Sequence, residues 1–392
     1  KMIAAGPSGS PYRGRKDVLP SGRNLFSTDP LSVPTRAAYK QGVKLADEFL
    51  RRNLQDRGDW PSGVIVDLWG SATMRTAGEE FAMALHLIGV KPEWASGSDR
   101  ISGFEILPLA LLDRPRIDTT LRVSGLFRDV FTTLSTLFQQ AIDALGERNE
   151  SKEFNPFVSA KNHNSARIFS AAPETYGIGM GDAAEQFNED GRKTAANAWI
   201  KSSQYAVNGS QVTQNKEALI SRIREADSFV HIQDMLETDI LLSADYAAHE
   251  GGFAAAKAEV GGQVNLYHLD NTNPEKPTTK SLSEEIARVV HARASNPDWL
   301  AGMTRHGHRG AAEIAATLLH MAAFSNLSHA VGSHLFDSFY DATVGNSEIL
   351  CFMQEVNPEA LDAMQDCFTR LRESGLWQTR RNSIHANLET VE

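Results

Sequence analysis

The chain contains the stretch Val64-Ile65-Val66-Asp67-Leu68-Trp69, which continues as Gly70-Ser71-Ala72-Thr73-Met74-Arg75-Thr76-Ala77-Gly78-Glu79. The first part is a short apolar run rich in β-branched residues, which predicts a buried strand. The second part is polar and ends with the spacing of a capping box, which predicts a helix that runs to about Gly89. A strand that leads through a polar turn into a helix is typical of α/β folds.

Four further apolar runs predict short strands, and helical patterns lie between them. The expected strands are Phe104–Leu107, Thr119–Val123, Phe229–Gln233 and Val264–Leu269. Helices are expected over 34–57, 130–145, 195–207, 216–226 and 253–260. After Asp270 the patterns are helical throughout, with helix starts at Ser281, Asn296-Pro297 and Asn357-Pro358. The sequence therefore predicts an α/β fold with a small, mostly parallel sheet flanked by helices, followed by an all-helical C-terminal subdomain.

The same patterns divide the chain into three parts. Residues 1–34 are rich in Gly, Pro and Arg and predict an irregular arm. Residues 35–275 form the expected α/β region, and within it the polar stretch 146–195 predicts an insertion or mobile loop. Residues 276–392 form the expected helical subdomain.

Composition limits the class of protein. The 392 residues are 41% hydrophobic, enough for a sizeable core, and no apolar run approaches the length of a membrane helix. A formal net charge of −10 argues against non-specific nucleic-acid binding. The two cysteines, Cys351 and Cys367, fit no zinc or redox spacing, and no secretory signal is present at the start. We therefore expect a cytoplasmic protein with reduced cysteines and no membrane span.

Polar side chains follow four of the predicted strands. They are found at 70–76, at 124–129, at Asp234, and at His268 and Asp270. Because ligands of open α/β sheets bind outside the carboxyl ends of the strands, these residues predict one shared crevice. The alternative is that they are ordinary turn and cap residues.

Three other groups have residue types that bind ligands. His306-Gly307-His308 predicts either a metal contact, because imidazole suits cobalt and similar ions, or a turn at the start of a helix. Arg13 and Arg23 in the arm predict either carboxylate recognition or a solvated loop. Glu250 precedes two glycines, which predict either close approach of a ligand or a loop that needs glycine for its backbone conformation.

Several motifs are absent from the sequence. It contains no G-x-x-x-x-G-K-[ST] loop for ATP, no G-x-G-x-x-G after a strand, no G-x-S-x-G elbow and no H-E-x-x-H. We therefore expect that any use of ATP depends on a partner protein.

Distinctive motifs follow one another over essentially the whole chain: Gly6–Arg15, Leu19–Phe26, Trp69–Thr76, Gly103–Pro108, Arg114–Asp118, Arg122–Asp129, Glu250–Gly252, Tyr267-His268, Pro274–Pro277 and Arg305–Ala311. In this order they resemble the CobN/magnesium-chelatase large-subunit family. Large subunits of this family are about three times as long, so the chain is expected to be their C-terminal third.

The resemblance implies a tetrapyrrole-binding subunit that works with two AAA+-type partner subunits, which bind ATP and Mg²⁺. The segments at 306–310 and 6–9 are closer to the cobalt branch, whose members insert Co(II) into the corrin hydrogenobyrinic acid a,c-diamide. Two alternatives stay open: a magnesium chelatase large subunit that binds protoporphyrin IX, and a tetrapyrrole-binding module without catalysis.

Metal insertion requires groups that handle the metal, accept protons and hold the ring. We expect His268, His306 and His308 to handle the metal, and Glu250 or Asp234 to act as base or acidic partner. The expected grip on the carboxylates of the ring comes from Arg13, Arg23, Arg75 and Arg128. No metal binding is assigned to His231, His249 or His329, because the sequence departs from the family pattern around them.

Overall fold

The computed structural model describes residues 29–158, 166–382 and 384, which form two compact units. Within these residues, unit 1 takes those up to Gly177 together with Ile200–Met235 and Tyr267–Thr279. Unit 2 takes Ile178–Trp199, Leu236–Leu266 and the residues from Lys280 onward. Each unit is therefore assembled from segments that are far apart in the sequence. The predicted division at 34 and 275 stays a prediction.

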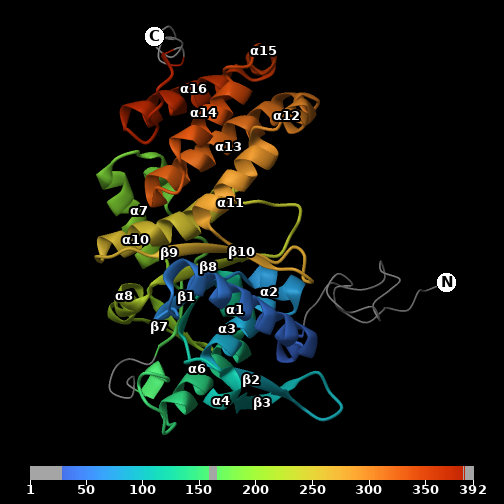
Figure 1. Ribbon diagram of the computed structural model, residues 1–392, viewed down its shortest axis with the longest axis vertical. Coiled ribbons are helices and arrows are strands. Elements are labelled where there is room, and N and C mark those ends of the chain that lie inside the picture. The colour runs from blue at the N-terminus through green and yellow to red at the C-terminus, as the bar shows by residue number, and fades with distance from the viewer. Residues whose placement is uncertain (1–28, 159–165, 383, 385–392) are drawn as a thin grey trace, which may run out of the picture. The chain divides into compact units, whose positions relative to one another are not determined.

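The described residues form an eight-stranded sheet with the order β10-β9-β8-β1-β4-β5-β6-β7. Strands β8 and β1 of this sheet lie side by side in Figure 1. Strand β1 runs parallel to β4 and β8, and β4 runs parallel to β5. At one edge β5, β6 and β7 pair in antiparallel fashion. The strands are β1 (Gly63–Leu68), β4 (Asp118–Val123), β5 (Ile168–Ser170), β6 (Tyr205–Asn208), β7 (Gln211–Gln214), β8 (Ser228–Gln233), β9 (Asn265–Asp270) and β10 (Thr278–Ser281).

All residues of β1 and β8 are buried, as is typical of parallel strands that are covered on both faces. The helices of unit 1 pack around this sheet, and α1 lies against α3. They are η2 (Pro30–Ser32), α1 (Arg36–Arg57), α2 (Gly70–Thr76), α3 (Glu79–Ile88), α4 (Leu109–Leu112), α5 (Gly125–Val130), α6 (Thr132–Gly146) and α8 (Lys216–Glu225). A separate hairpin joins β2 (Val90–Trp94) to β3 (Ile101–Ile106).

Unit 2 is helical apart from its segments of β9 and β10. Its core forms where α13 packs on α16, and where Tyr340, Phe368 and Trp377 contact one another. Its elements are η4 (Gly181–Glu185), α7 (Glu189–Lys201, which ends in unit 1), α9 (Ala244–Tyr246), the π-helical turn η5 (Ala247–Gly251), α10 (Gly252–Glu259), α11 (Leu282–Val289), the π-helical turn η6 (Val290–Ala294), α12 (Pro297–Thr304), α13 (Gly307–Ser328), α14 (Ser333–Ala342), α15 (Ser347–Val356) and α16 (Pro358–Glu373). Across the described residues, no helix combines the length and apolar character needed to cross a bilayer.

The predicted fold class is confirmed: the sheet is mostly parallel and the C-terminal part is helical. Helix starts were predicted well where side-chain caps decide them. Ser281 closes a complete capping box with Glu284, and Asn296 and Asn357 cap helices that begin with proline. Helix α1 begins after the cap Thr35, so Pro34 precedes the helix instead of lying in its first turn.

Two local predictions were wrong. The helix expected over 195–207 ends at Lys201, because Tyr205–Asn208 pairs with β5 and turns at Gly209, whose φ is +60°. The capping box expected at Thr76–Glu79 does not start α3, whose N-cap is Gly78. Thr76 instead ends α2, although its Oγ1 still accepts from the backbone N–H of Glu79. Strand β5 and the start of α7 lie within the polar stretch 146–195.

Candidate functional site at the carboxyl end of the sheet

The sheet register brings Asp67 between two other charged or titratable side chains. Asp67 of β1 is the Cα partner of Arg122 on β4 and of His231 on β8, so all three are neighbours across three parallel strands. The Asp67 carboxylate accepts from Nη1 of Arg122 at 3.4 Å and from Nδ1 of His231 at 3.3 Å. The indole N–H of Trp69 donates to the same carboxylate at 2.7 Å.

This cluster is excluded from water. The relative exposure of Asp67, Arg122 and His231 is 2%, 2% and 3%. Burial lowers the pKa of Arg122, and the adjacent Asp67 carboxylate opposes that effect. A carboxylate that accepts from both a guanidinium and an imidazole fixes the orientation of the two side chains.

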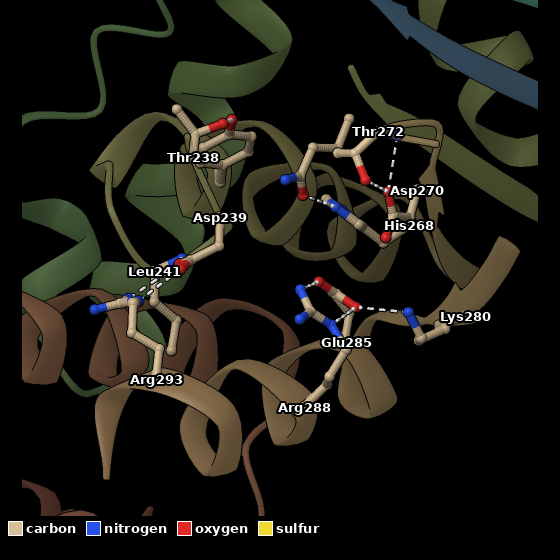
Figure 2. Close-up of polar contacts among 12 residues, drawn as sticks. Thr238, Asp239, Leu241, His268, Asp270, Thr272, Lys280, Glu285, Arg288 and Arg293 are labelled. Atoms are coloured by element: carbon tan, nitrogen blue, oxygen red, sulfur yellow. Dashed lines mark hydrogen bonds and ion pairs between the residues drawn. The ribbon is translucent and has the colours of Figure 1, made fainter. Parts of the chain in front are cut away.

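His268 extends the cluster onto β9. Its ring centroid lies 5.7 Å from that of His231, and its Nε2 donates to Oε1 of Gln233 at 2.9 Å. The amide of Gln233 is fixed in turn, because its Nε2 donates to the carbonyl of Met235. The structure therefore places His268, predicted to handle metal, beside His231, to which the sequence assigned no metal binding. Figure 2 shows His268 with its ring turned toward an amide oxygen.

Arg75 and Asp234, predicted to hold substrate and to act in catalysis, form a pair with each other. Nε and Nη2 of Arg75 donate to the two carboxylate oxygens of Asp234 at 2.7 and 2.8 Å. The side chain of Arg75 is 33% exposed, whereas that of Asp234 is 7% exposed. An anion that approaches Arg75 from solvent therefore meets a guanidinium that already has a carboxylate partner.

Two carboxylates of α3 join this region, and the sequence did not point to either of them as functional. Glu79 accepts from Nδ2 of Asn271 at 2.6 Å, and Oδ1 of Asn271 accepts from Gln41. Glu80 is 2% exposed, and its Oε2 accepts from the hydroxyl of Thr76 at 2.9 Å. Its Oε1 has no hydrogen-bond partner among the described residues.

The acidity of Glu80 is strongly altered. Burial, reinforced by the nearby charges of Asp234 and Glu79, raises the pKa of Glu80 to about 8. A carboxyl group of this kind keeps its proton near neutrality and can release or accept it there. Altered acidity in a polar cluster is characteristic of functional sites.

Arg128, the remaining described arginine predicted to hold substrate, is buried and already engaged. Its guanidinium donates to the carbonyls of Ala171 and Ala172 and pairs with Asp129 at 2.7 Å. It thereby holds the loop that follows β5 against the last turn of α5. The predicted arginines Arg13 and Arg23 lie outside the described residues.

The remaining predicted site residues belong to unit 2. Glu250 is completely buried in the π-helical turn η5. His306 and His308 are exposed where α13 begins, and Gly307 between them has a φ of +53°. The segment is thus the start of a helix, one of the two predictions made for it. Among the described residues, no group of three or more His, Cys, Asp or Glu side chains is arranged to hold a metal ion.

A further pair in unit 2, half-buried, was also missed. The guanidinium of Arg293 faces the carboxylate of Asp239 and binds both of its oxygens, as Figure 2 shows. In addition, His320 donates from Nδ1 to the carbonyl of Leu241 at 2.7 Å. These contacts fix the segment after β8 to the helices of unit 2. Nothing in their sequence spacing, 54 and 79 residues apart, indicates them.

Comparison with known proteins identifies the family of the chain. The family model described as CobN/Magnesium Chelatase matches residues 1–384. The chain belongs to this family. A curated relative from Sinorhizobium sp, named aerobic cobaltochelatase subunit CobN, is 40% identical over 100% of the chain and 32% of its own length. The chain therefore spans about a third of this relative.

Other members of the CobN/magnesium chelatase family show how far the similarity extends. A solved structure titled "Catalytic Subunit of Cobaltochelatase from Mycobacterium tuberculosis" matches with a TM-score of 0.89 and 33% identity, over 99% of this chain and 34% of that one. The chloroplastic magnesium-chelatase protein ChlH of Oryza sativa subsp. japonica is 25% identical over 97% of the chain and 29% of its own length. The chain is thus more similar to these cobaltochelatase members than to this magnesium one.

Proposed function

We propose that the chain forms the ring-binding part of the large subunit of a cobaltochelatase, which inserts Co(II) into hydrogenobyrinic acid a,c-diamide. The names of the relatives at 40% and 33% identity support the cobalt branch. One structural observation carries the proposal: acids and imidazoles from neighbouring strand ends gather, buried, at the carboxyl edge of the sheet. Asp67, His231, His268 and Asp234 form this group, with Glu80 from α3 beside it.

The chemistry of insertion gives these residues a role. Co(II) enters the corrin ring as its inner N–H proton leaves, so a proton must be accepted near neutral pH. An imidazole can act as a general base, and Glu80, with a pKa raised to about 8, holds an exchangeable proton near neutral pH. In this proposal His268 handles the metal, and Asp234 acts as base or acidic partner, with the exchangeable proton of Glu80 nearby.

Ring recognition is proposed to depend on arginine. Arg75 is a third exposed and binds Asp234 in bidentate fashion, so a ring carboxylate competes with Asp234 for the guanidinium. Competition of this kind would release Asp234 as an acidic partner when the ring binds. Arg13 and Arg23 are proposed to grip further carboxylates, whereas Arg128 acts by positioning the loop after β5.

The histidines of unit 2 are proposed to meet the metal first. His306 and His308 are exposed, and imidazole is a good ligand for Co(II), so they would capture the ion from solution. Glu250 is proposed as a further base, since π-helical turns are frequent at functional sites. ATP and Mg²⁺ are assigned to two AAA+-type partner subunits, because the sequence has no phosphate-binding loop of its own.

Absorption spectroscopy tests the proposal. The 392-residue chain is titrated with hydrogenobyrinic acid a,c-diamide and, separately, with protoporphyrin IX. A saturable spectral shift with the corrin and a weaker one with the porphyrin is expected. A preference for protoporphyrin IX would assign the chain to the magnesium branch, and absence of binding to both would reject the proposal. Insertion is then measured with the longer subunit, its ATPase partners, ATP and Co(II). Ring binding without insertion would support the alternative of a tetrapyrrole-binding module without catalysis.

A further inference from the structure

Tyr176 is 64% exposed, yet its ring is fixed from three sides. Its hydroxyl donates to Oδ2 of Asp129 at 2.9 Å, and the guanidinium carbon of Arg128 lies 5.7 Å from the ring centroid. On the third side is Gly125: a Cβ added there would lie 2.6 Å from Cδ1 of Tyr176. The backbone of Gly125 therefore contacts the ring directly, and only glycine leaves room for it.

The charges around Tyr176 keep it in this orientation. The hydrogen bond from Arg128 lowers the pKa of Asp129, so this carboxylate is ionised and accepts from the tyrosine hydroxyl. The bond to Asp129 in turn raises the pKa of Tyr176, which keeps the phenol protonated as the donor. Ordering a side chain costs conformational entropy, and here the ordering leaves most of the ring uncovered. An exposed ring held in one orientation is preorganised for contact with a flat partner.

The position of Tyr176 links it to the candidate site. Gly125 follows Ser124, and Ser124 Oγ accepts from the N–H of Gly70, the second residue after β1. Leu126, which is 38% exposed, lies against Gly70 as well. Two exposed apolar side chains, Tyr176 and Leu126, therefore border the same carboxyl ends of β1 and β4 at which the buried cluster around Asp67 is found.

We infer that Tyr176 stacks on the conjugated face of the tetrapyrrole and so positions the ring at the carboxyl ends of β1 and β4. The inference rests on the proposed function and adds to it a positioning residue. A flat conjugated ligand gains most from a rigid aromatic surface, because such stacking adds to ordinary area burial. Arg128 then contributes through Tyr176: its guanidinium lies near one side of the phenol ring and leaves another side to the ligand.

The test compares four variants with the wild-type chain in the titration with hydrogenobyrinic acid a,c-diamide. Tyr176→Ala is expected to weaken ring binding about three- to tenfold, the range that aromatic stacking contributes. Tyr176→Trp keeps a stacking surface and is expected to retain affinity within about twofold. Gly125→Ala is expected to match Tyr176→Ala, because the added methyl group displaces the ring. The control is Leu111→Ala, since Leu111 is 74% exposed on α4 and should not alter binding.

Each outcome separates the inference from the proposed function. If the wild-type chain binds the corrin and Tyr176→Ala binds equally well, stacking is rejected while the proposed function stands. Loss of affinity in Tyr176→Trp as large as that in Tyr176→Ala would also reject stacking, since it would point to the hydroxyl contact with Asp129. If the wild-type chain binds no ring, both fail. Circular dichroism of each variant verifies that the fold is unchanged.

Discussion

Asp67 and His231 lie side by side on adjacent parallel strands, with the carboxylate 3.3 Å from Nδ1 of the imidazole. Their positions in the sequence are 164 residues apart. The same carboxylate balances the charge of Arg122 on the other neighbouring strand. Three side chains that would each be costly to bury alone are thus buried together.

Removal of the charge of Asp67 is expected to destabilise the fold. Asp67→Asn leaves the Arg122 guanidinium buried without its counter-ion, a change that costs about 3–5 kcal/mol in comparable buried pairs. The measurement is the free energy of unfolding in urea at 25 °C. The matched control is Asp99→Asn, which breaks the exposed pair with Arg36 and should cost at most about 1 kcal/mol. If the two substitutions lower the free energy of unfolding by equal amounts, the buried pair contributes no more to stability than the exposed pair.

Glu80 is expected to make stability depend on pH. The pKa of Glu80 is about 8 in the folded chain, whereas the ordinary value for a glutamate, taken for the unfolded chain, is 4.5. Between these two pH values the folded state holds a proton that the unfolded state has lost. The contribution of this group to stability should therefore fall as pH rises from about 4.5 to about 8. Glu80→Gln mimics the protonated form and removes that contribution.

Urea unfolding at pH 5 and pH 8 measures this effect. The advantage of Glu80→Gln over the wild type should be larger at pH 8 than at pH 5. The exposed Glu153→Gln serves as the control and should show no such trend. If the advantage of Glu80→Gln is the same at both pH values, the acidity assigned to Glu80 is wrong.

Arg75 and Asp234 are expected to stabilise the fold as a pair, whereas ring affinity is expected to depend on the position of the Arg75 cation. A double-mutant cycle with Arg75→Ala and Asp234→Ala should give a coupling free energy of about 1–3 kcal/mol, since the pair is bidentate and largely buried on one side. The exchanged pair, Arg75→Asp with Asp234→Arg, should recover part of the stability. It should not recover ring affinity, because the cation has moved. Full recovery of affinity in the exchanged pair would contradict the role given to Arg75.

His306 and His308 are expected to affect metal handling without affecting the fold. Both are exposed, so their replacement by Ala should change stability by no more than about 0.5 kcal/mol. In the longer subunit with its partners, the double variant should insert cobalt more slowly at low Co(II) concentration and approach the wild-type rate when Co(II) is abundant. A normal rate at low Co(II) with ring binding intact would remove these residues from the mechanism.

The sequence predicted those parts of the fold that local patterns decide. Apolar runs located β1, β4, β8 and β9, and side-chain caps located the starts of α11, α12 and α16. The antiparallel edge was missed because β6 follows α7 so closely that Ala195–Val207 has a continuous helical pattern. Pairing with β5 overrides that local preference.

The candidate site was predicted only in part, since its geometry depends on register between distant strands. His268, Arg75 and Asp234 were predicted from their positions after strands, and the structure brings His268 near His231 and Arg75 against Asp234. Glu79 and Glu80 were overlooked because Glu79 was interpreted as part of a helix cap. Its carboxylate instead binds Asn271, a contact that spans 192 residues.

The central position of β1 has a consequence for biosynthesis of the chain. Val64 pairs with Ser228, so β1 leaves the ribosome about 160 residues before one of its two neighbours does. Until β8 has been translated, one edge of β1 and the apolar side chains around it lack their native cover, and long-range pairing of this kind is slow. A nascent chain halted before residue 228 should therefore bind a chaperone. A nascent chain that extends past β10 should no longer need the chaperone and should dissociate from it.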